Sequence, residues 1–303
     1  MMLEEAMREA CAVVGIEPPR KSDHGRWLPT PVIGKSKGNT SGRVMINDDG
    51  QTGVAWNHAT GQHQRFWIGG VAASVPAPKR DVEKERRQAA ERKEVEQICA
   101  GIVLACRQEE HPYLAAKGFP DEIGLVMDDP RTVIPSTKIG DLIASALPEC
   151  DGPLLIVPGR IGSKVATVQF ITAEGNKKNI IRGQMSGAAH RIATGRETWV
   201  AEGIGTALTI RAALRSLGRS ATVLSAFSAS NVAKVASAIP GAIIAADNDK
   251  PIETLGGLGA GEYYARKSGK KWTMPPVRGD FNDMHTSEGI RAVALHLREA
   301  VPP

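Results

Sequence analysis

The chain has 303 residues, 42% of them hydrophobic and 23% charged, which is the composition of a globular protein long enough for two domains and a linker. No apolar run approaches the roughly 20 residues that span a bilayer, and the N-terminal segment lacks the apolar stretch of a secretory signal, so we expect a cytoplasmic protein without membrane association. The net charge of +5 favours a polyanionic partner only weakly.

The cysteines argue against two classes of fold. None of the four belongs to a C-x-x-C pair, so neither a zinc ribbon nor a disulfide framework is indicated. Cysteine usage of this kind fits a reducing compartment. The four residues are Cys11, Cys99, Cys106 and Cys150.

The first 75 residues are expected to form a small β-rich module. After an amphipathic helix over 3–14, glycine-rich turns separate short runs typical of antiparallel strands at 42–46, 53–56 and 64–68. Its aromatic residues have two interpretations, stacking on nucleic-acid bases or filling a small core, and we favour the core for at least two of the three. These residues are Trp56, Phe66 and Trp67.

A proline-containing linker at 75–78 precedes a strongly charged segment. Alternating charges and good helix formers predict a long solvated helix over 79–107. In the domain division, residues 76–96 are a charged helical linker. Contacts from Arg86, Arg87 and Arg92 to nucleic acid are the less favoured alternative.

Residues 97–195 are expected to form an α+β subdomain. A short helix and turn over 111–124 come first, and strands follow at 154–157 and 164–171, with a return strand at 179–182. Basic side chains on this hairpin could hold a triphosphate or a template backbone, although exposed lysines are often only solvated. The candidates are Lys164, Lys177, Lys178, Arg182 and Arg191, of which Arg182 is the better placed in the sequence.

From residue 196 onward, strands and helices alternate, which predicts a parallel sheet with right-handed crossovers. The expected strands cover 198–201, 221–226, 242–246 and 271–274. The glycine-rich segment 257–261 is interpreted as a flexible loop before a helix near 259–268.

Acidic residues follow three of these strands. Glu202 follows the first, Asp247 and Asp249 the third, and Asp280 and Asp283 the last. The carboxyl ends of parallel strands meet at one edge of a sheet, where ligands bind. Carboxylates gathered there repel one another unless a cation neutralises them, and oxygen ligands of this type suit Mg²⁺ or Mn²⁺.

These motifs resemble a Toprim domain over residues 196–290. Glu202 followed by Gly203 matches the single glutamate of that family, and Asp247-Asn-Asp249 matches its Asp-x-Asp. Segment 279–283 is similar to a motif of the phage and plasmid primases of this superfamily, which are related to bacterial primases. Segment 113–119 and hairpin 164–182 also look like that group, so the resemblance covers roughly 95–295.

The resemblance implies an α/β fold, in which a Toprim-type parallel sheet with flanking helices over 196–303 is preceded by an α+β primase subdomain. Many such primases begin with a Cys/His zinc ribbon, but here the matching thiols are missing. We therefore expect a metal-free module in that position, and zinc held by His24, His58 and His63 is disfavoured.

The implied activity is that of a DNA-dependent RNA primase, a nucleotidyltransferase for DNA replication of a phage, plasmid or similar element. Asp247 and Asp249 would hold Mg²⁺ with the incoming nucleoside triphosphate, and Glu202 would hold a second ion or act as general base. Asp280 and Asp283 would complete or position the metal site, with Asn282 as a structural hydrogen-bonder. Single-stranded DNA is the implied template, and a replicative helicase is a candidate partner.

Two other functions remain open at this stage. A Toprim nuclease would use the same carboxylates for hydrolysis, and a non-catalytic accessory protein would bind single-stranded DNA. A topoisomerase is disfavoured because it needs a nucleophilic tyrosine in a large separate domain. The only tyrosines are Tyr113, Tyr263 and Tyr264.

Overall fold

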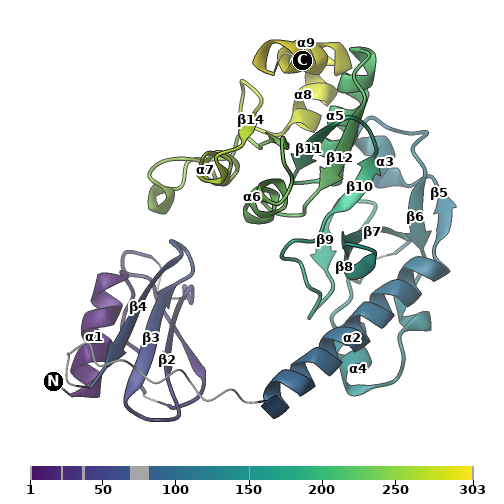
Figure 1. The fold of residues 1–303 in the computed structure, drawn as a ribbon. Helices are drawn as coiled ribbons and strands as arrows, with labels where there is room; N and C mark the ends of the chain where they lie inside the picture. Colours follow the sequence, from purple (N-terminus) through teal and green to yellow (C-terminus); the bar gives the residue numbers. More distant parts are fainter. Residues whose placement is uncertain (1, 22, 36–37, 69–81, 150, 302–303) are drawn as a thin grey trace. The chain divides into compact units, whose positions relative to one another are not determined.

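The computed structural model describes residues 2–21, 23–35, 38–68, 82–149 and 151–301 (Figure 1). The chain forms two compact units, residues 1–80 and 81–303, which we describe separately. The expected linker at 75–78 and the thiol of Cys150 lie outside the described residues. Among the helices described, none is long and apolar enough to cross a membrane.

The N-terminal unit is a four-stranded antiparallel sheet covered on one face by helix α1, Leu3–Val13 (Figure 1). The strands follow one another in chain order, and three of them lie where the sequence predicts. The additional strand, β1, contains Pro29, a residue that disfavours strand assignment from sequence but is tolerated at a sheet edge. The strands are β1 Trp27–Thr30, β2 Gly42–Ile46, β3 Thr52–Asn57 and β4 Gln62–Trp67.

Burial alternates along these strands because only one face of the sheet meets α1. Val44 and Phe66 point to the helix and are 0% and 4% exposed. Trp56 and Trp67 point to the other face and are only partly buried. The expectation that at least two of the three aromatic residues fill the core is therefore wrong, since Phe66 alone does so.

The second unit begins with helix α2, Val82–Ala105, which lies along an antiparallel sheet. Val95, Ile98 and Ile102 of this helix are at most 4% exposed and pack against strand residues. The expectation of a solvated helix is thus wrong for its C-terminal half. The charged segment at the start of the helix dominates the sequence pattern, and the apolar positions that are buried come after it. The sheet has the order β5 Arg107–Glu109, β6 Gly124–Met127, β7 Leu154–Ile161, β8 Lys164–Ile171 and β9 Lys177–Asn179.

Shorter helices join the strands of this antiparallel sheet. α3 precedes β6, and a 3₁₀ turn and α4 lie between β6 and β7. α4 shares a hydrophobic core with α2 on one face of the sheet. The helices are α3 Pro112–Ala116, η1 Pro130–Val133 and α4 Lys138–Ser145.

The last sheet contains the predicted strand–helix alternation. Four strands run parallel, and an additional strand, β10, His190–Ala193, pairs antiparallel with β12 at the edge. The strand order is β10-β12-β11-β13-β14. The parallel strands are β11 Glu197–Ala201, β12 Ala221–Ser225, β13 Ile243–Ala245 and β14 Lys271–Thr273.

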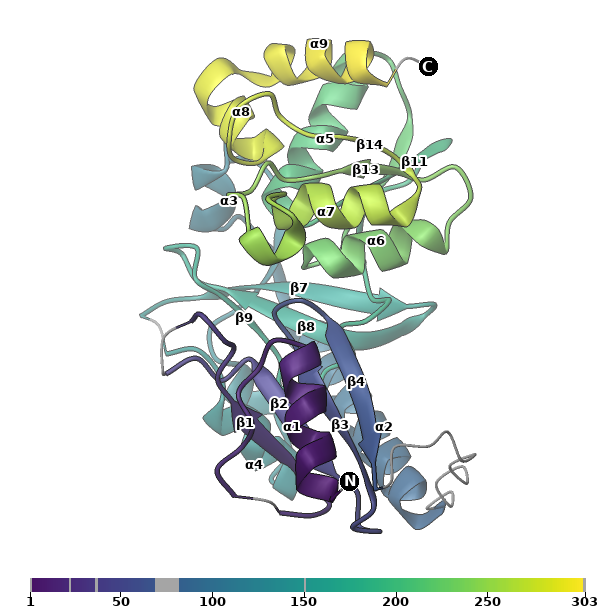
Figure 2. The same cartoon turned by 90° about the vertical axis from the view of Figure 1, so that its left-hand side faces the viewer.

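Helices cover both faces of this mixed sheet, which makes it the middle of three layers (Figure 2). Trp199 faces one helical layer and Val200 the other, since successive residues of a strand point to opposite sides. One layer contains α5 Ile204–Ser216, α8 Phe281–Glu288 and α9 Ile290–Ala300; the other contains α6 Ala229–Ser237 and α7 Ala260–Ser268; η2 Glu253–Leu255 precedes α7.

A further apolar cluster joins the two sheets of this unit. Tyr113 of α3 and Ile171 of β8 pack with Ile204 and Leu208 at the start of α5. This contact places α3 and β9 beside the loop between β11 and α5. The predicted division between 97–195 and 196–303 stays a prediction, because both sheets belong to one compact unit.

Candidate active site

Four carboxylates gather beyond the carboxyl ends of neighbouring strands. Ala201 and Ala245 are paired residues of β11 and β13, so Glu202 and Asp247 leave the sheet next to each other. Backbone hydrogen bonds in both directions between Asn248 and Gly279 bring the following residue, Asp280, to the same place. The structure therefore brings together Glu202, Asp247, Asp249 and Asp280, which act on one another electrostatically.

Asp247 has the most perturbed environment of the four. Burial, followed by the charges of Glu202, Asp280 and Asp249, raises its pKa to about 8. Its Oδ1 atom is buried without a hydrogen-bond partner. A buried carboxylate oxygen of this kind costs free energy until a donor or a cation reaches it.

Glu202 lies between the sheet and the start of α6. Burial and the charge of Asp249 raise its pKa, while a hydrogen bond from the backbone N–H of Ala229 lowers it. That N–H belongs to the first turn of α6, where the helix dipole favours a negative charge. Phe227, just before this helix, has φ +69°, and its backbone N–H donates to the Glu202 carbonyl. The glutamate is thus held by both its side chain and its backbone.

Asp249 is fixed by the start of α7. Its Oδ2 accepts a hydrogen bond from the Gly261 backbone N–H at 2.9 Å. A Cβ atom on Gly261 would lie 2.3 Å from the Asp247 carbonyl oxygen, so only glycine allows the helix to approach the Asp-x-Asp backbone this closely. Segment 257–261 is consequently not simply a loop, because its last two residues open α7 against the acidic motif.

The Gly261→Ala variant is expected to lose about 1–3 kcal/mol of unfolding free energy, the usual cost of inserting a methyl group into a packed site. The clash is with backbone, which cannot rotate away. Urea unfolding measures this loss. Gly101→Ala in α2 is the matched control, since nothing lies within 4 Å of its added Cβ, and it should keep or raise stability. An equally stable Gly261→Ala protein would contradict the close approach.

Asp280 and Asp283 have a local structural role at α8. The Asp283 N–H donates to Asp280 Oδ1 at 2.8 Å, and the Asp280 N–H donates to Asp283 Oδ2 at 3.0 Å, which is a reciprocal capping box. Asp283 is exposed and is not among the charges that raise the pKa of Asp247. The structure therefore places Asp283 in the α8 cap, where it contacts Asp280 but is not among the charges that act on Glu202 and Asp247.

The prediction that Asn282 is a structural hydrogen-bonder is confirmed. Its side chain is 1% exposed, and its Nδ2 donates to the Lys117 carbonyl oxygen at 2.8 Å and to Thr209 Oγ1 at 3.1 Å. These bonds tie α8 to the end of α3 and to α5. They also hold the segment that carries Asp280 in position.

The carboxylates fit a divalent cation only in part. Over the described ranges, no group of three or more His, Cys, Asp or Glu side chains is arranged to hold a metal ion, including at His24, His58 and His63. Mg²⁺, however, commonly takes one or two protein carboxylates and completes its shell with water and substrate phosphates. The unpartnered Asp247 oxygen and the repulsion among four acids are what such an ion would relieve. The residues thus suit a Mg²⁺ ion whose coordination shell is completed by water and by the phosphates of a substrate.

The metal-free protein is expected to lose stability as the pH rises from about 4 to 8. The folded-state pKa of Asp247 is raised, so the stabilisation is complete below its ordinary pKa and is lost as the pH passes about 8. One pKa unit corresponds to about 1.4 kcal/mol, and 1 kcal/mol shifts Tm by about 2–4 °C at this size, so the fall should be several degrees. Thermal melts in EDTA measure it.

Two variants and one ion test the cause of this pH dependence. Asp247→Asn should flatten the slope, whereas Asp283→Asn should keep it. Added Mg²⁺ should restore stability near pH 8 in the wild type. An identical slope in Asp247→Asn would assign the effect to other groups.

Lys177 is the predicted basic residue that reaches the carboxylates. Its charge lowers the pKa of both Glu202 and Asp247. Its Nζ lies beside Gly203, 3.5 Å from where a Cβ would be, and 5.7 Å from the centre of the Tyr113 ring. Lys177 is thus a cation at the entrance to an acidic site.

The neighbouring Lys178 lies on the opposite side of the sheet. Lys177 pairs with Ile171, which faces the cluster around Tyr113, whereas Lys178 pairs with Phe170, which faces α2. Residues paired across strands project to the same side, so the two lysines diverge.

The other predicted basic residues are not brought to the carboxylates. Lys164 forms an ion pair with Glu96 of α2 at 3.2 Å, and it lies at the opposite end of β8 from Ile171, about 23 Å of extended strand away. Arg182 is exposed, with φ +66°. Arg191 lines a cavity of about 340 Å³ with Glu122 and other residues.

Sequence reasoning missed Lys117 and Tyr113 as parts of this site. Lys117 Nζ lies 5.9 Å from the centre of the Tyr113 ring, and its side chain packs against Gly205, at the start of α5. Two lysines from different elements therefore flank one buried tyrosine next to the Glu202 loop. The resemblance of segment 113–119 to primases was the available signal, but it did not indicate contact with the carboxylates.

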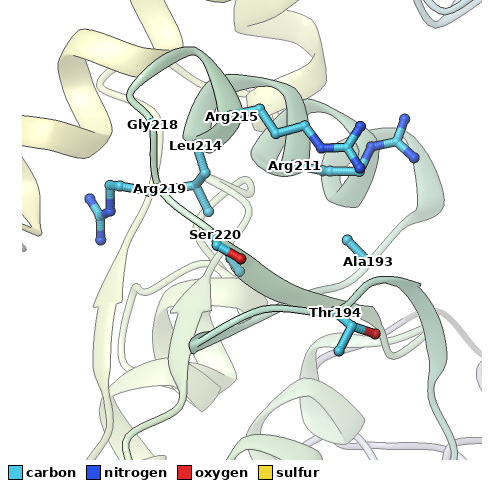
Figure 3. A pocket seen from close by; sticks show the side chains of 9 residues that line it. Ala193, Thr194, Arg211, Leu214, Arg215, Gly218, Arg219 and Ser220 are labelled. Carbon is cyan, nitrogen blue, oxygen red and sulfur yellow. The ribbon is translucent and has the colours of Figure 1, made fainter.

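A separate cavity of about 360 Å³ opens at the other edge of the sheet, near the amino end of β12 (Figure 3). Figure 3 shows Arg211 and Arg215 side by side at its rim. The Arg211 guanidinium is paired with Glu122, and that of Arg219 with Glu197. Because these cations stabilise the fold and the cavity lies away from the strand ends that carry the carboxylates, it is not the candidate active site.

No known family model matches the chain. In structure it is similar to the primase fragment of the bacteriophage T7 primase-helicase protein, with a TM-score of 0.36 and 17% identity, covering 49% of this chain and 65% of that fragment. The chain thus spans less than two thirds of the fragment. It is also similar to a chain in a structure of bacteriophage T7 lagging-strand DNA polymerase interacting with primase domains of two gp4 subunits bound to an RNA/DNA hybrid and dTTP. The TM-score is 0.36 with 17% identity, and the match covers 58% of this chain and 91% of that chain.

Proposed function

We propose that this protein is a DNA-dependent RNA primase of the Toprim type, which synthesises short primers on single-stranded DNA from nucleoside triphosphates. The observation that carries the proposal is the cluster of Glu202, Asp247, Asp249 and Asp280 at adjoining strand ends, with Lys177 beside it. The motif resemblance supports the same assignment. Replication of a phage, plasmid or similar element, with a helicase as partner, is part of the proposal.

The reaction is the attack of a nucleotide 3′-hydroxyl on an α-phosphate with release of pyrophosphate. Bound Mg²⁺ or Mn²⁺ would supply charge neutralisation at the attacking and leaving oxygens. Asp247 and Asp249 are the residues proposed to hold it, because one has an unpartnered oxygen and the other is fixed at the start of α7. The burial of Asp247 strengthens any such charge interaction.

Glu202 and Lys177 are proposed to act on the reacting groups. A raised pKa suits Glu202 to accept the proton of the attacking hydroxyl, and the Ala229 N–H keeps its carboxylate in place. Lys177 is placed to donate charge-assisted hydrogen bonds to phosphate oxygens of the triphosphate. In this proposal the carboxylates bind the metal ion, and Lys177 next to them binds the phosphates of the triphosphate.

The decisive experiment is de novo synthesis on circular single-stranded DNA with labelled ribonucleotides and Mg²⁺ or Mn²⁺. Short labelled products that disappear with Glu202→Gln support the proposal. Metal-dependent cutting of the circle without nucleotide incorporation would replace it by a nuclease. Intact DNA and no incorporation on any of a panel of random-sequence circles would leave only a DNA-binding role and refute the primase.

A further inference from the structure

The N-terminal unit has one sheet face that no described element covers. Helix α1 packs on the side of Val44 and Phe66, and the alternate residues of every strand point to the other side. The cross-strand pairs confirm that these residues share a face, since each one is registered opposite another of the set. The open face consists of Trp27, Pro29, Arg43, Met45, Thr52, Val54, Trp56, His63, Arg65 and Trp67.

Aromatic rings are concentrated on this open face, which holds three of the five tryptophans of the chain. Trp27, which is 41% exposed, meets Trp56 edge-on with ring centres 6.1 Å apart. Trp56 also stacks on His58 at 4.4 Å and lies 6.2 Å from His63. Trp27 is exposed and Trp56 and Trp67 are only partly buried, whereas the core of this unit is formed on the other side of the sheet.

The polar groups of the open face favour a polyanion. Arg43 and Arg65 lie among the tryptophans, and none of the side chains on this face is acidic. Aromatic side chains interleaved with arginine on one surface are typical of proteins that stack unpaired bases and track a phosphate backbone.

We propose that the open face of β1–β4 is a stacking platform for the bases of single-stranded nucleic acid. Trp27 and Trp56 hold bases by their rings, and Arg43 and Arg65 neutralise the adjoining phosphates. This module therefore binds the strand directly, without a metal ion. The inference stands on the N-terminal unit alone and does not depend on the carboxylates of the second unit.

The test compares two labelled oligonucleotides of equal length, one of thymidines and one of abasic sites, which carry the same phosphates but differ in bases. Fluorescence anisotropy of the full chain is measured in EDTA without nucleotides, so a failure of primer synthesis does not affect the result. The wild type should bind the thymidine strand at least about 10-fold more tightly, the usual gain from one stacked base. Equal affinities would overturn the proposal.

The variants assign that preference to the open face. Trp27→Ala combined with Trp56→Ala should remove most of the thymidine-over-abasic ratio and leave abasic binding unchanged, whereas Trp56→Phe should keep the ratio. An unchanged ratio in the double variant would overturn the proposal. If that variant changed the oligomeric state in gel filtration but not the ratio, the face would be a protein interface instead.

A second measurement covers the case in which the double variant fails to fold. In a Trp272→Phe background, the remaining indoles are the three of the open face and the fully buried Trp199. Thymidine strands should quench the fluorescence of this protein, and abasic strands should not. Absence of quenching at saturating thymidine strand would contradict stacking.

Discussion

The Asp247→Asn variant is expected to lose primer synthesis by on the order of 10³-fold. A bound divalent ion contributes several kcal/mol to stabilising the transition state, and each 1.36 kcal/mol changes a rate tenfold. The substitution keeps the size of the side chain but removes the charge that faces the proposed metal position. Initial rates of labelled-nucleotide incorporation measure the loss.

Asp283→Asn is the matched control for this prediction. Asp283 is close in sequence to the cluster, but it belongs to the α8 cap and is exposed. Activity within about threefold of the wild type is expected, since asparagine retains an acceptor for the capping box. If both variants lost activity equally, Asp283 would be a metal ligand, as the sequence alone suggested.

The Lys177→Ala variant is expected to reduce kcat/KM for the nucleoside triphosphate by about 10- to 100-fold. A hydrogen bond to a charged group contributes about 1.5–3 kcal/mol, and the phosphates of the substrate would lose that partner. Lys177 lies at the Glu202 loop, where its charge acts on two of the carboxylates. The measurement is a nucleotide titration at fixed template.

Lys178→Ala is the matched control for Lys177→Ala, because the two lysines are adjacent in sequence but lie on opposite faces of the sheet. Activity close to that of the wild type is expected. A loss of equal size in both variants would point to a general electrostatic contribution of the hairpin and would contradict a specific role for Lys177.

Much of the last sheet of the second unit could be predicted from its apolar periodicity. The runs before Glu202 and before Asp247 are continuous and short, as expected for parallel strands buried on both faces, and the structure places β11 and β13 there. The edge strand β10 was missed, because none of its four residues is fully buried and they show no clear period. The apolar half of α2 was missed because a long charged run precedes it.

The basic residues show where sequence reasoning stops. Arg182 was the favoured candidate on its neighbours in the chain, yet it is the charge of Lys177, and not that of Arg182, that acts on Glu202 and Asp247. Side-chain direction in a strand alternates with every residue, so a one-residue difference in register decides which lysine faces the site. The pairing of β9 with β8 sets this register, and the amino-acid sequence of the hairpin does not reveal it.

The sequence by itself determined the strand–helix alternation of the last sheet and the acidic residues at its strand ends. Both are local signals, because hydrophobic period and chain position suffice to reveal them. Only the tertiary structure decided which acids meet, that Asp283 caps a helix, that Lys117 and Tyr113 join Lys177, and that three tryptophans share an open sheet face. These facts depend on contacts between residues far apart in the chain, which are set by packing and register and are not encoded in any short segment.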